Sequence, residues 1–142
     1  MSNDQILAPM LGVMVLTTIV WFVLYARRIP AMRKAGAPTQ EYTTPDKGAT
    51  LLPEEVSYPS NNLKNLFELP VLFYGLCLYL FVTQSAEPAD IYAAWVFFGF
   101  RVVHSAIHCT VNIVVARFAA YFVATLALWF MLARAVVGMV GA

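Results

Sequence analysis

Four long apolar stretches alternate along the chain with polar or charged connections. They cover residues 6–25, 66–82, 91–115 and 118–140. A helix that crosses the hydrocarbon core of a bilayer needs about 20 predominantly apolar residues, and each stretch is close to that length. The pattern predicts an all-α membrane protein: a bundle of four transmembrane helices that forms one domain over residues 1–142.

The third stretch contains a row of polar side chains. Arg101, His104 and His108 follow one another at i, i+3 and i+7, so a helix carries them on one face. A charged side chain near the bilayer centre costs about 2.5–3.5 kcal/mol on insertion scales and usually faces a partner or a cavity. The row therefore predicts a polar function inside the bundle.

The connection between the first two stretches, residues 27–60, differs from the others. It holds five of the eight prolines and most of the charged residues, so it is predicted to be a long loop. A short acidic segment, residues 85–90, joins the second stretch to the third. The third and fourth stretches are separated only by a predicted turn at Ala116 and Arg117.

Basic residues gather on one side of the predicted membrane. Residues 27–64 contain six of the nine Lys and Arg residues, and Arg117 lies in the last predicted turn. The terminal tails and the acidic connection contain none. The positive-inside rule therefore places the long loop in the cytoplasm and both termini outside it.

Composition supports a membrane protein and narrows the possible functions. The chain is 61% hydrophobic and 12% charged, whereas soluble domains are about 45–50% apolar and about 25% charged. A net charge of +1 gives no support for nucleic-acid binding. Cys77 and Cys109 lack the spacing of a metal site, and we interpret them as buried apolar side chains.

Polar groups from three stretches are predicted to meet at one depth. Asn61, Asn65 and Glu68 share one face at i, i+4 and i+7 where the second stretch enters the membrane, and Pro70 is expected to kink the helix there. Glu68 lies about 10 Å along the helix from Asn61, and His108 lies about 10 Å from Val115 at the cytoplasmic end of the third stretch. The predicted cluster consists of Asn65, Glu68, Arg101, His104, His108, Arg117 and Tyr121.

The members of this cluster also have structural interpretations. Glu68 and Arg101 would form a buried ion pair that fixes helix packing, and His104 would be a hydrogen-bonded core residue. The arginine and tyrosine of the fourth stretch would anchor the helix at the membrane interface. A further alternative is metal or haem binding by His104 and His108, which are four residues apart on one face.

Two segments of the chain resemble the MAPEG family, the membrane-associated proteins in eicosanoid and glutathione metabolism. NLKNLFELPVLFYGL, residues 62–76, opens the second stretch, and FRVVHSAIH, residues 100–108, lies in the third. Both are similar to segments of small bacterial members. The Asn-x-x-Glu pair is weak evidence alone. It becomes fairly specific together with the Arg-x-x-His pair and with the arginine and tyrosine that begin the fourth stretch.

The resemblance implies a four-helix bundle that assembles as a homotrimer. Members of the family hold glutathione, as co-substrate, between neighbouring subunits on the cytoplasmic side. The second substrate would be a lipophilic small molecule or a lipid. The residues that the resemblance implies for glutathione binding are Arg27, Asn65, Glu68, Arg101, His104 and His108. The implied catalytic residues are Arg117, which would stabilise the thiolate of glutathione, and Tyr121 one turn later.

The expected function is that of a glutathione-dependent transferase or peroxidase for hydrophobic electrophiles, in a bacterial inner membrane. Three positions depart from the family pattern. Asn61 stands where the active enzymes usually carry arginine, His108 stands where they carry tyrosine, and Phe118 replaces a small polar residue of the prostaglandin branch. These departures keep open a second interpretation, a non-catalytic member that binds a lipid or a partner protein in the same pocket.

Overall fold

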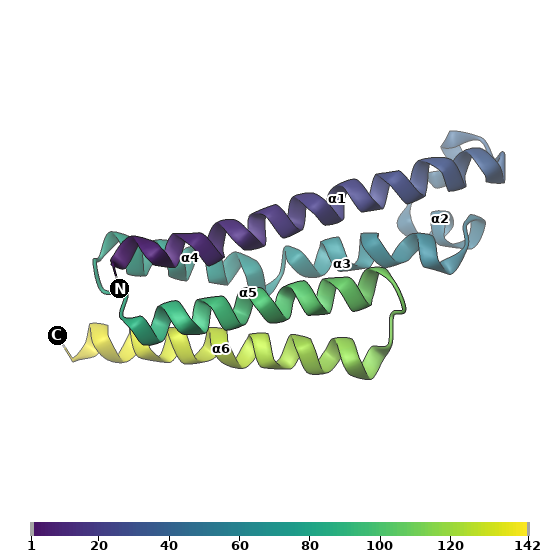
Figure 1. Ribbon diagram of the computed structural model, residues 1–142. Coiled ribbons are helices and arrows are strands. Elements are labelled where there is room, and N and C mark those ends of the chain that lie inside the picture. The colour runs from purple at the N-terminus through teal and green to yellow at the C-terminus, as the bar shows by residue number, and fades with distance from the viewer. Residues whose placement is uncertain (1, 142) are drawn as a thin grey trace.

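The computed structural model describes residues 2–141, and every regular element in that range is a helix. The long helices lie side by side and extend along one direction (Figure 1). They are α1 (Leu7–Ala35), the consecutive pair α3 (Tyr58–Leu66) and α4 (Leu69–Val82), α5 (Pro88–Cys109) and α6 (Val114–Val140). Shorter elements are α2 (Pro45–Leu51) and the 3₁₀ helices η1 (Asn3–Ile6), η2 (Thr39–Tyr42) and η3 (Glu54–Ser57). The predicted all-α fold is confirmed.

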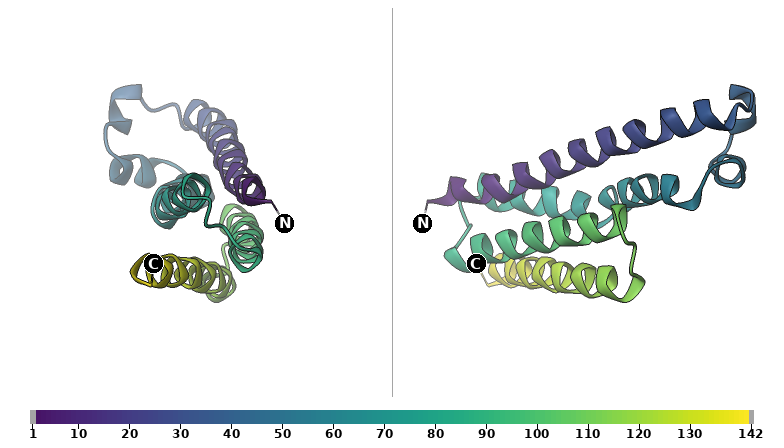
Figure 2. Two further views of the ribbon diagram at one scale, coloured as in Figure 1. Left: turned by 90° about the vertical axis from the view of Figure 1, so that its left-hand side faces the viewer. Right: turned by 45° about the vertical axis from the view of Figure 1, so that its right-hand side comes forward.

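Both chain ends lie at one end of the bundle, and α2 lies at the other end (Figures 1 and 2). Within the described residues, three helical segments are long and apolar enough to cross a membrane: Asn3–Ala35, Glu54–Val82 and Val114–Val140. Helix α5, where the sequence predicted a further span, is not among them. It carries Asp90, Arg101 and two histidines, which lower its hydropathy. All four side chains are buried in the bundle and therefore contact protein and not lipid.

The first helix is longer than the sequence predicted. It continues beyond the apolar stretch 6–25 to Ala35, and Gly36 then ends it in the left-handed conformation at φ 67°. The predicted loop 27–60 therefore contains the last turns of α1, the short helices and the start of α3. Hydropathy predicts where the chain leaves the membrane, and not where the helix ends. Most residues between 27 and 35 favour a helix, so α1 continues beyond the apolar stretch.

The turn between α5 and α6 lies at residues 110–113 and not at Ala116 and Arg117 as predicted. Asn112 forms it at φ 48°, a conformation that asparagine adopts more readily than most residues. Apolar residues continue through the turn from Val111 to Val115, so hydropathy gave no boundary. Arg117 consequently belongs to the first turn of α6, and His108 is next to the last residue of α5.

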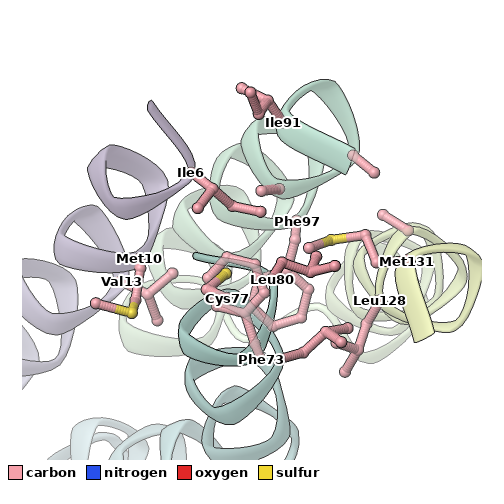
Figure 3. Close-up of a cluster of buried hydrophobic side chains, with 14 of the residues drawn as sticks. Ile6, Met10, Val13, Phe73, Cys77, Leu80, Ile91, Phe97, Leu128 and Met131 are labelled. Atoms are coloured by element: carbon pink, nitrogen blue, oxygen red, sulfur yellow. The ribbon is translucent and has the colours of Figure 1, made fainter. Parts of the chain in front are cut away.

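A hydrophobic core fills the half of the bundle near the chain termini (Figure 3). The rings of Phe73 on α4 and Phe97 on α5 stack there with centroids 4.2 Å apart. Val13 of α1 and Met131 of α6 are fully buried against the same cluster. The outer faces of the helices carry large exposed apolar side chains, as expected for contact with lipid tails. The other half of the bundle contains the buried polar row of α5 and a smaller hydrophobic cluster of Leu16, Val20, Leu66 and Cys109.

Candidate functional site

Helix α5 buries a row of polar side chains. Arg101, His104 and His108 are 0%, 3% and 6% exposed, and Ser105 between them is 2% exposed. Their spacing gives them one shared face, as the sequence predicted. The face points into the bundle toward α3 and α6, so these groups depend on the protein, and not on water, for their partners.

Arg101 joins three helices. One terminal nitrogen, Nη2, donates to the side-chain oxygen of Asn65 at 2.8 Å and to the backbone oxygen of the same residue at 3.3 Å. The guanidinium carbon lies 5.8 Å from the ring centroid of Tyr121 on α6, within cation–π distance. Arg101, Asn65 and Tyr121, all predicted members of the cluster, are therefore in contact.

A break between α3 and α4 shapes this contact. Helix α3 ends at Leu66, and Glu68 has φ −95° and ψ −104°, outside the helical region. Pro70 follows at the start of α4, where its missing N–H group is tolerated. The predicted kink beside Glu68 is thus a true interruption of the helix, which exposes the Asn65 carbonyl to Arg101.

The two histidines and Tyr121 form an aromatic group beside Arg101. The Nδ1 atom of His104 lies 2.8 Å from the backbone oxygen of Arg117. Because a carbonyl oxygen only accepts, the hydrogen is on Nδ1, and Nε2 of a neutral ring is then an acceptor. The ring of His104 is 5.4 Å from that of His108 and 5.9 Å from that of Tyr121, measured between centroids.

Four nitrogen atoms of this row are buried without a hydrogen-bond partner in the described part of the chain. They are Nε and Nη1 of Arg101, Nε2 of His104 and Nδ1 of His108. A buried polar atom without a partner costs about 1–3 kcal/mol, and more when the group is charged. Arg101 also lacks a carboxylate partner, because both ion pairs found within residues 2–141 belong to Arg134. The row has the composition of a binding surface for an anionic, hydrogen-bonding group.

The sequence predicted that Glu68 lies in the cluster with this row, but the structure does not place it there. Its side chain is exposed and forms no ion pair with Arg101. The interruption at residues 67–68 changes the backbone direction, so the helical spacing from Asn61 to Glu68 no longer defines one face. The structural alternative of a buried Glu68–Arg101 pair is wrong for this arrangement, because Asn65 takes the place of Glu68.

Arg117 and Arg27 lie at the end of the polar row and bond to the turn between α5 and α6. Arg117 donates to the side-chain oxygen of Asn112, and Arg27 donates to the backbone oxygen of Cys109. Arg27 thus contacts its own chain at the C-terminal end of α5, where free carbonyl groups attract cations. Both guanidinium groups approach the row from the side of His108.

A second buried network was not predicted. Asn62 is fully buried and donates to the sulfur of Cys109 at 3.4 Å, while Ser105 donates to the Asn62 side-chain oxygen at 3.3 Å. The sequence interpretation emphasised its exposed neighbour Asn61 instead. A signal existed, because Asn62 shares a helical face with Pro59 and Leu66, which are both buried. The network fixes α3 against α5 one turn from the Asn65–Arg101 contact.

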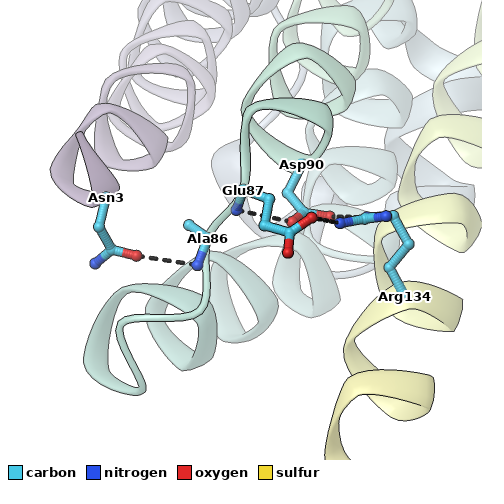
Figure 4. A network of polar contacts seen from close by, with 5 residues as sticks. All are labelled: Asn3, Ala86, Glu87, Asp90 and Arg134. Carbon is cyan, nitrogen blue, oxygen red and sulfur yellow. Dashed lines mark hydrogen bonds and ion pairs between the residues drawn. The ribbon is translucent and has the colours of Figure 1, made fainter. Parts of the chain in front are cut away.

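The opposite end of the bundle carries a separate ionic network (Figure 4). Arg134 of α6 pairs with Glu87 and with Asp90 at the start of α5, the latter at 2.8 Å. Glu87 and Asp90 also form a reciprocal capping box at this helix start. Asn3 accepts a hydrogen bond from the Ala86 N–H group at 3.0 Å. Glu87, Asp90 and Arg134 are all paired, which indicates a structural role.

Residues 2–141 contain no group of three or more His, Cys, Asp or Glu side chains arranged to hold a metal ion. His104 and His108 therefore have no third protein ligand of these types within one chain. The nearby charges are those of arginines, which disfavour a cation.

Comparison with known proteins gives one match. The model of the MAPEG family matches residues 6–137 of the chain. No curated protein and no solved structure shows significant similarity to the chain. The matched range includes every residue of the polar row and all of its contacts on the other helices.

Proposed function

Because the chain belongs to the MAPEG family, we propose that it is an integral membrane enzyme that uses glutathione, either as a transferase or as a peroxidase, on hydrophobic electrophiles. The family and the three apolar helical segments indicate a membrane protein. The choice of glutathione, the reaction and the site residues are the proposal.

The observation that carries this proposal is the unpaired state of Arg101. A fully buried guanidinium without a carboxylate partner is costly, and two of its nitrogens have no acceptor. Glutathione carries two carboxylates, two amide groups and one amine. A carboxylate accepting from Arg101 would supply the missing counter-charge, and the free nitrogens of His104 and His108 would bond to its amide or amine groups.

The remaining ligand contacts would come from the edges of the row. Asn65 orients Arg101 and retains amide hydrogens for a ligand, while the exposed carboxylate of Glu68 would receive the glutamyl amine. Arg27 would complete the binding set from α1, about two turns before the helix ends. Its present bond to the Cys109 carbonyl uses one nitrogen and leaves others available.

Arg117 and Tyr121 are the proposed catalytic residues. A free thiol has a pKa near 8.5, and a neighbouring cation lowers it. Arg117 would hold the glutathione sulfur as a thiolate, and Tyr121 would donate a hydrogen bond to it. The sulfur would then attack the electrophile, with the electron pair leaving on the displaced group, so the protein needs no nucleophile of its own.

The proposed assembly is a homotrimer of four-span subunits. Both termini would lie outside the cytoplasm of a bacterial cell and the long connection inside it, as the distribution of Lys and Arg predicts. A ligand bound between subunits would explain why so many buried nitrogens lack partners within one chain. Native mass spectrometry should give about three times the chain mass of 15.8 kDa.

A non-catalytic role is the second candidate, and one contact favours it. Arg117 donates to Asn112, so its guanidinium is engaged in holding the turn. With Asn61 in place of an arginine, α3 also has one cation fewer than in the active enzymes of the family. A lipid or a partner protein would then occupy the same polar row without thiol chemistry.

Glutathione titration of the purified protein, read by thiolate absorbance, tests the proposal. The wild type should give a saturable signal, Arg101→Gln should lose binding, and Arg117→Ala should bind without forming thiolate. Arg33→Ala, an exposed arginine of α1 outside the site, is the matched control. Absence of binding at millimolar glutathione would overturn the proposal, and a co-purified lipid that glutathione does not displace would support the second candidate.

A further inference from the structure

A polar cavity lies away from the α5 row, where α2 packs between the far ends of α1 and α3 (Figure 1). Its volume is about 140 Å³, far above the roughly 10–15 Å³ that one water needs. A small group of several heavy atoms therefore fits inside it. The polar side chains that line it are Arg28, Asp46, Ser57, Ser60, Asn61 and Lys64.

The charges in this cavity are not paired with one another. Within residues 2–141, the two ion pairs are both made by Arg134, so Asp46 lies beyond 4.0 Å from the nitrogens of Arg28 and Lys64. Arg28 is half-buried. Asp46 and Lys64 are exposed, and their separation from Arg28 leaves room for a ligand between the three charges.

Gly48 of α2 lies beside Arg28. This glycine is buried, and a Cβ atom there would lie 3.6 Å from Nη2 of Arg28 and 3.6 Å from the ring of Tyr42, which is ordinary van der Waals contact. The Arg28 guanidinium is thus close to α2, which supplies Asp46 to the same cavity.

We infer that this cavity binds the phosphoethanolamine head group of a membrane phospholipid. Arginine and lysine are the usual partners of phosphate oxygens, and the hydroxyl and amide groups of Ser57, Ser60 and Asn61 add neutral donors. Asp46 gives the site an acceptor for a primary ammonium group. A ligand with a phosphate and an amine a few bonds apart matches this combination better than a simple anion does.

The position of the cavity favours a lipid over a soluble ligand. Arg28 lies three residues after the apolar stretch that ends at Tyr25, a rise of about 4.5 Å along the helix. If α1 crosses the membrane, as its length and composition allow, this depth is the level of the lipid head groups. Such a site would fix the connection 36–57 to the membrane surface, independently of any glutathione chemistry.

Native mass spectrometry of the full-length protein in detergent tests this inference. The protein is titrated with short-chain phosphatidylethanolamine, phosphatidylglycerol and phosphatidylcholine, and separately with soluble O-phosphoethanolamine. We expect the ethanolamine lipid to bind most tightly. Arg28→Gln should weaken it about tenfold or more, and Asp46→Asn should remove the preference for ethanolamine over glycerol. Arg33→Gln, which changes an exposed arginine of the same helix outside the cavity, should have no effect.

Several results would overturn the inference. Equal binding of the three lipids, or Arg28→Gln binding as well as wild type, would exclude a head-group site here. Soluble O-phosphoethanolamine binding as tightly as the lipid would exclude a lipid as the ligand. Displacement of the lipid by glutathione would show that the cavity belongs to the glutathione site and would overturn the inference. If the protein binds the lipid but not glutathione, the inference is supported and the proposed function is not.

Discussion

The contact between Asn65 and Arg101 is the first test of the polar row. Asn65→Ala removes the acceptor at 2.8 Å and leaves only the longer bond to the backbone oxygen. We expect a loss of about 1–3 kcal/mol in stability, because one more N–H group of the buried guanidinium then lacks its acceptor. Thermal unfolding in detergent measures the loss, and glutathione affinity should fall with it.

Asn61→Ala is the matched control, since Asn61 is an exposed asparagine one helical turn earlier on α3. It should leave the unfolding temperature within experimental error of wild type. Equal effects of the two substitutions would contradict the importance of the Asn65–Arg101 contact.

Arg134 allows a second prediction at the scale of single residues. Arg134→Gln leaves the carboxylate of Asp90 buried without its ion-pair partner, at 3% side-chain exposure. We expect a loss of about 1–3 kcal/mol, less than for a fully buried pair because the Arg134 side chain is 34% exposed. Arg134→Lys should recover part of the loss in thermal unfolding, and glutathione binding should be unchanged because the network is at the other end of the bundle.

The sequence predicted the members of the polar row better than their partners. Arg101, His104 and His108 lie on an unbroken helix, so their spacing of three and four residues was sufficient to give one buried face. Asn61 and Glu68 were misplaced because the interruption at residues 67–68 separates them. Pro70 indicated a kink at this point, but no local rule gives the ψ of −104° at Glu68 that turns the kink into an interruption.

At the scale of helices, α1 packs closely against α5 at Gly12. A Cβ atom there would lie 2.8 Å from Cε2 of Phe98, below any ordinary contact distance. Gly12→Ala should therefore push the helices apart or displace the ring, at a cost of about 1–3 kcal/mol. Thermal unfolding measures this change.

Gly75→Ala is the control for this prediction, because nothing lies within 4 Å of a Cβ atom at that position in α4. Alanine should stabilise the helix there by up to about 1 kcal/mol. The double variant Gly12→Ala with Phe98→Leu should recover stability relative to Gly12→Ala. A Gly12→Ala protein as stable as wild type would show that the two helices adjust without strain.

Helix boundaries were the part of the fold that hydropathy predicted least well. Two boundaries were predicted wrongly: the end of α1 and the turn between α5 and α6. Hydropathy predicts whether a segment contacts lipid or water, but it does not predict the backbone conformation. Helix α1 continues past its apolar part, and the turn between α5 and α6 is itself apolar. Asn112 was the available signal for that turn, because asparagine is several-fold enriched among non-glycine residues with positive φ.

For the whole molecule, the bundle divides along its length. The apolar core occupies the half near the termini, and the polar row, Arg27 and Arg117 occupy the half near the connection 36–57. The other basic residues between positions 28 and 64 lie at the same end: Arg28, Arg33, Lys34, Lys47 and Lys64. A charged ligand would therefore reach the row from the side on which the positive-inside rule places the cytoplasm, which makes the orientation of the chain a condition for the proposed function.

Single cysteines test that orientation. In a Cys77→Ala, Cys109→Ala background, Thr43→Cys places a thiol in the connection between α1 and α3, and Ser85→Cys places one between α4 and α5. Both positions are exposed. If the termini lie outside, a membrane-impermeant maleimide should label Ser85→Cys in intact cells and Thr43→Cys only after permeabilisation. The reverse pattern would place the polar row toward the outer face, away from cytoplasmic glutathione. The proposed enzyme would then have no access to its thiol even if the purified protein bound it.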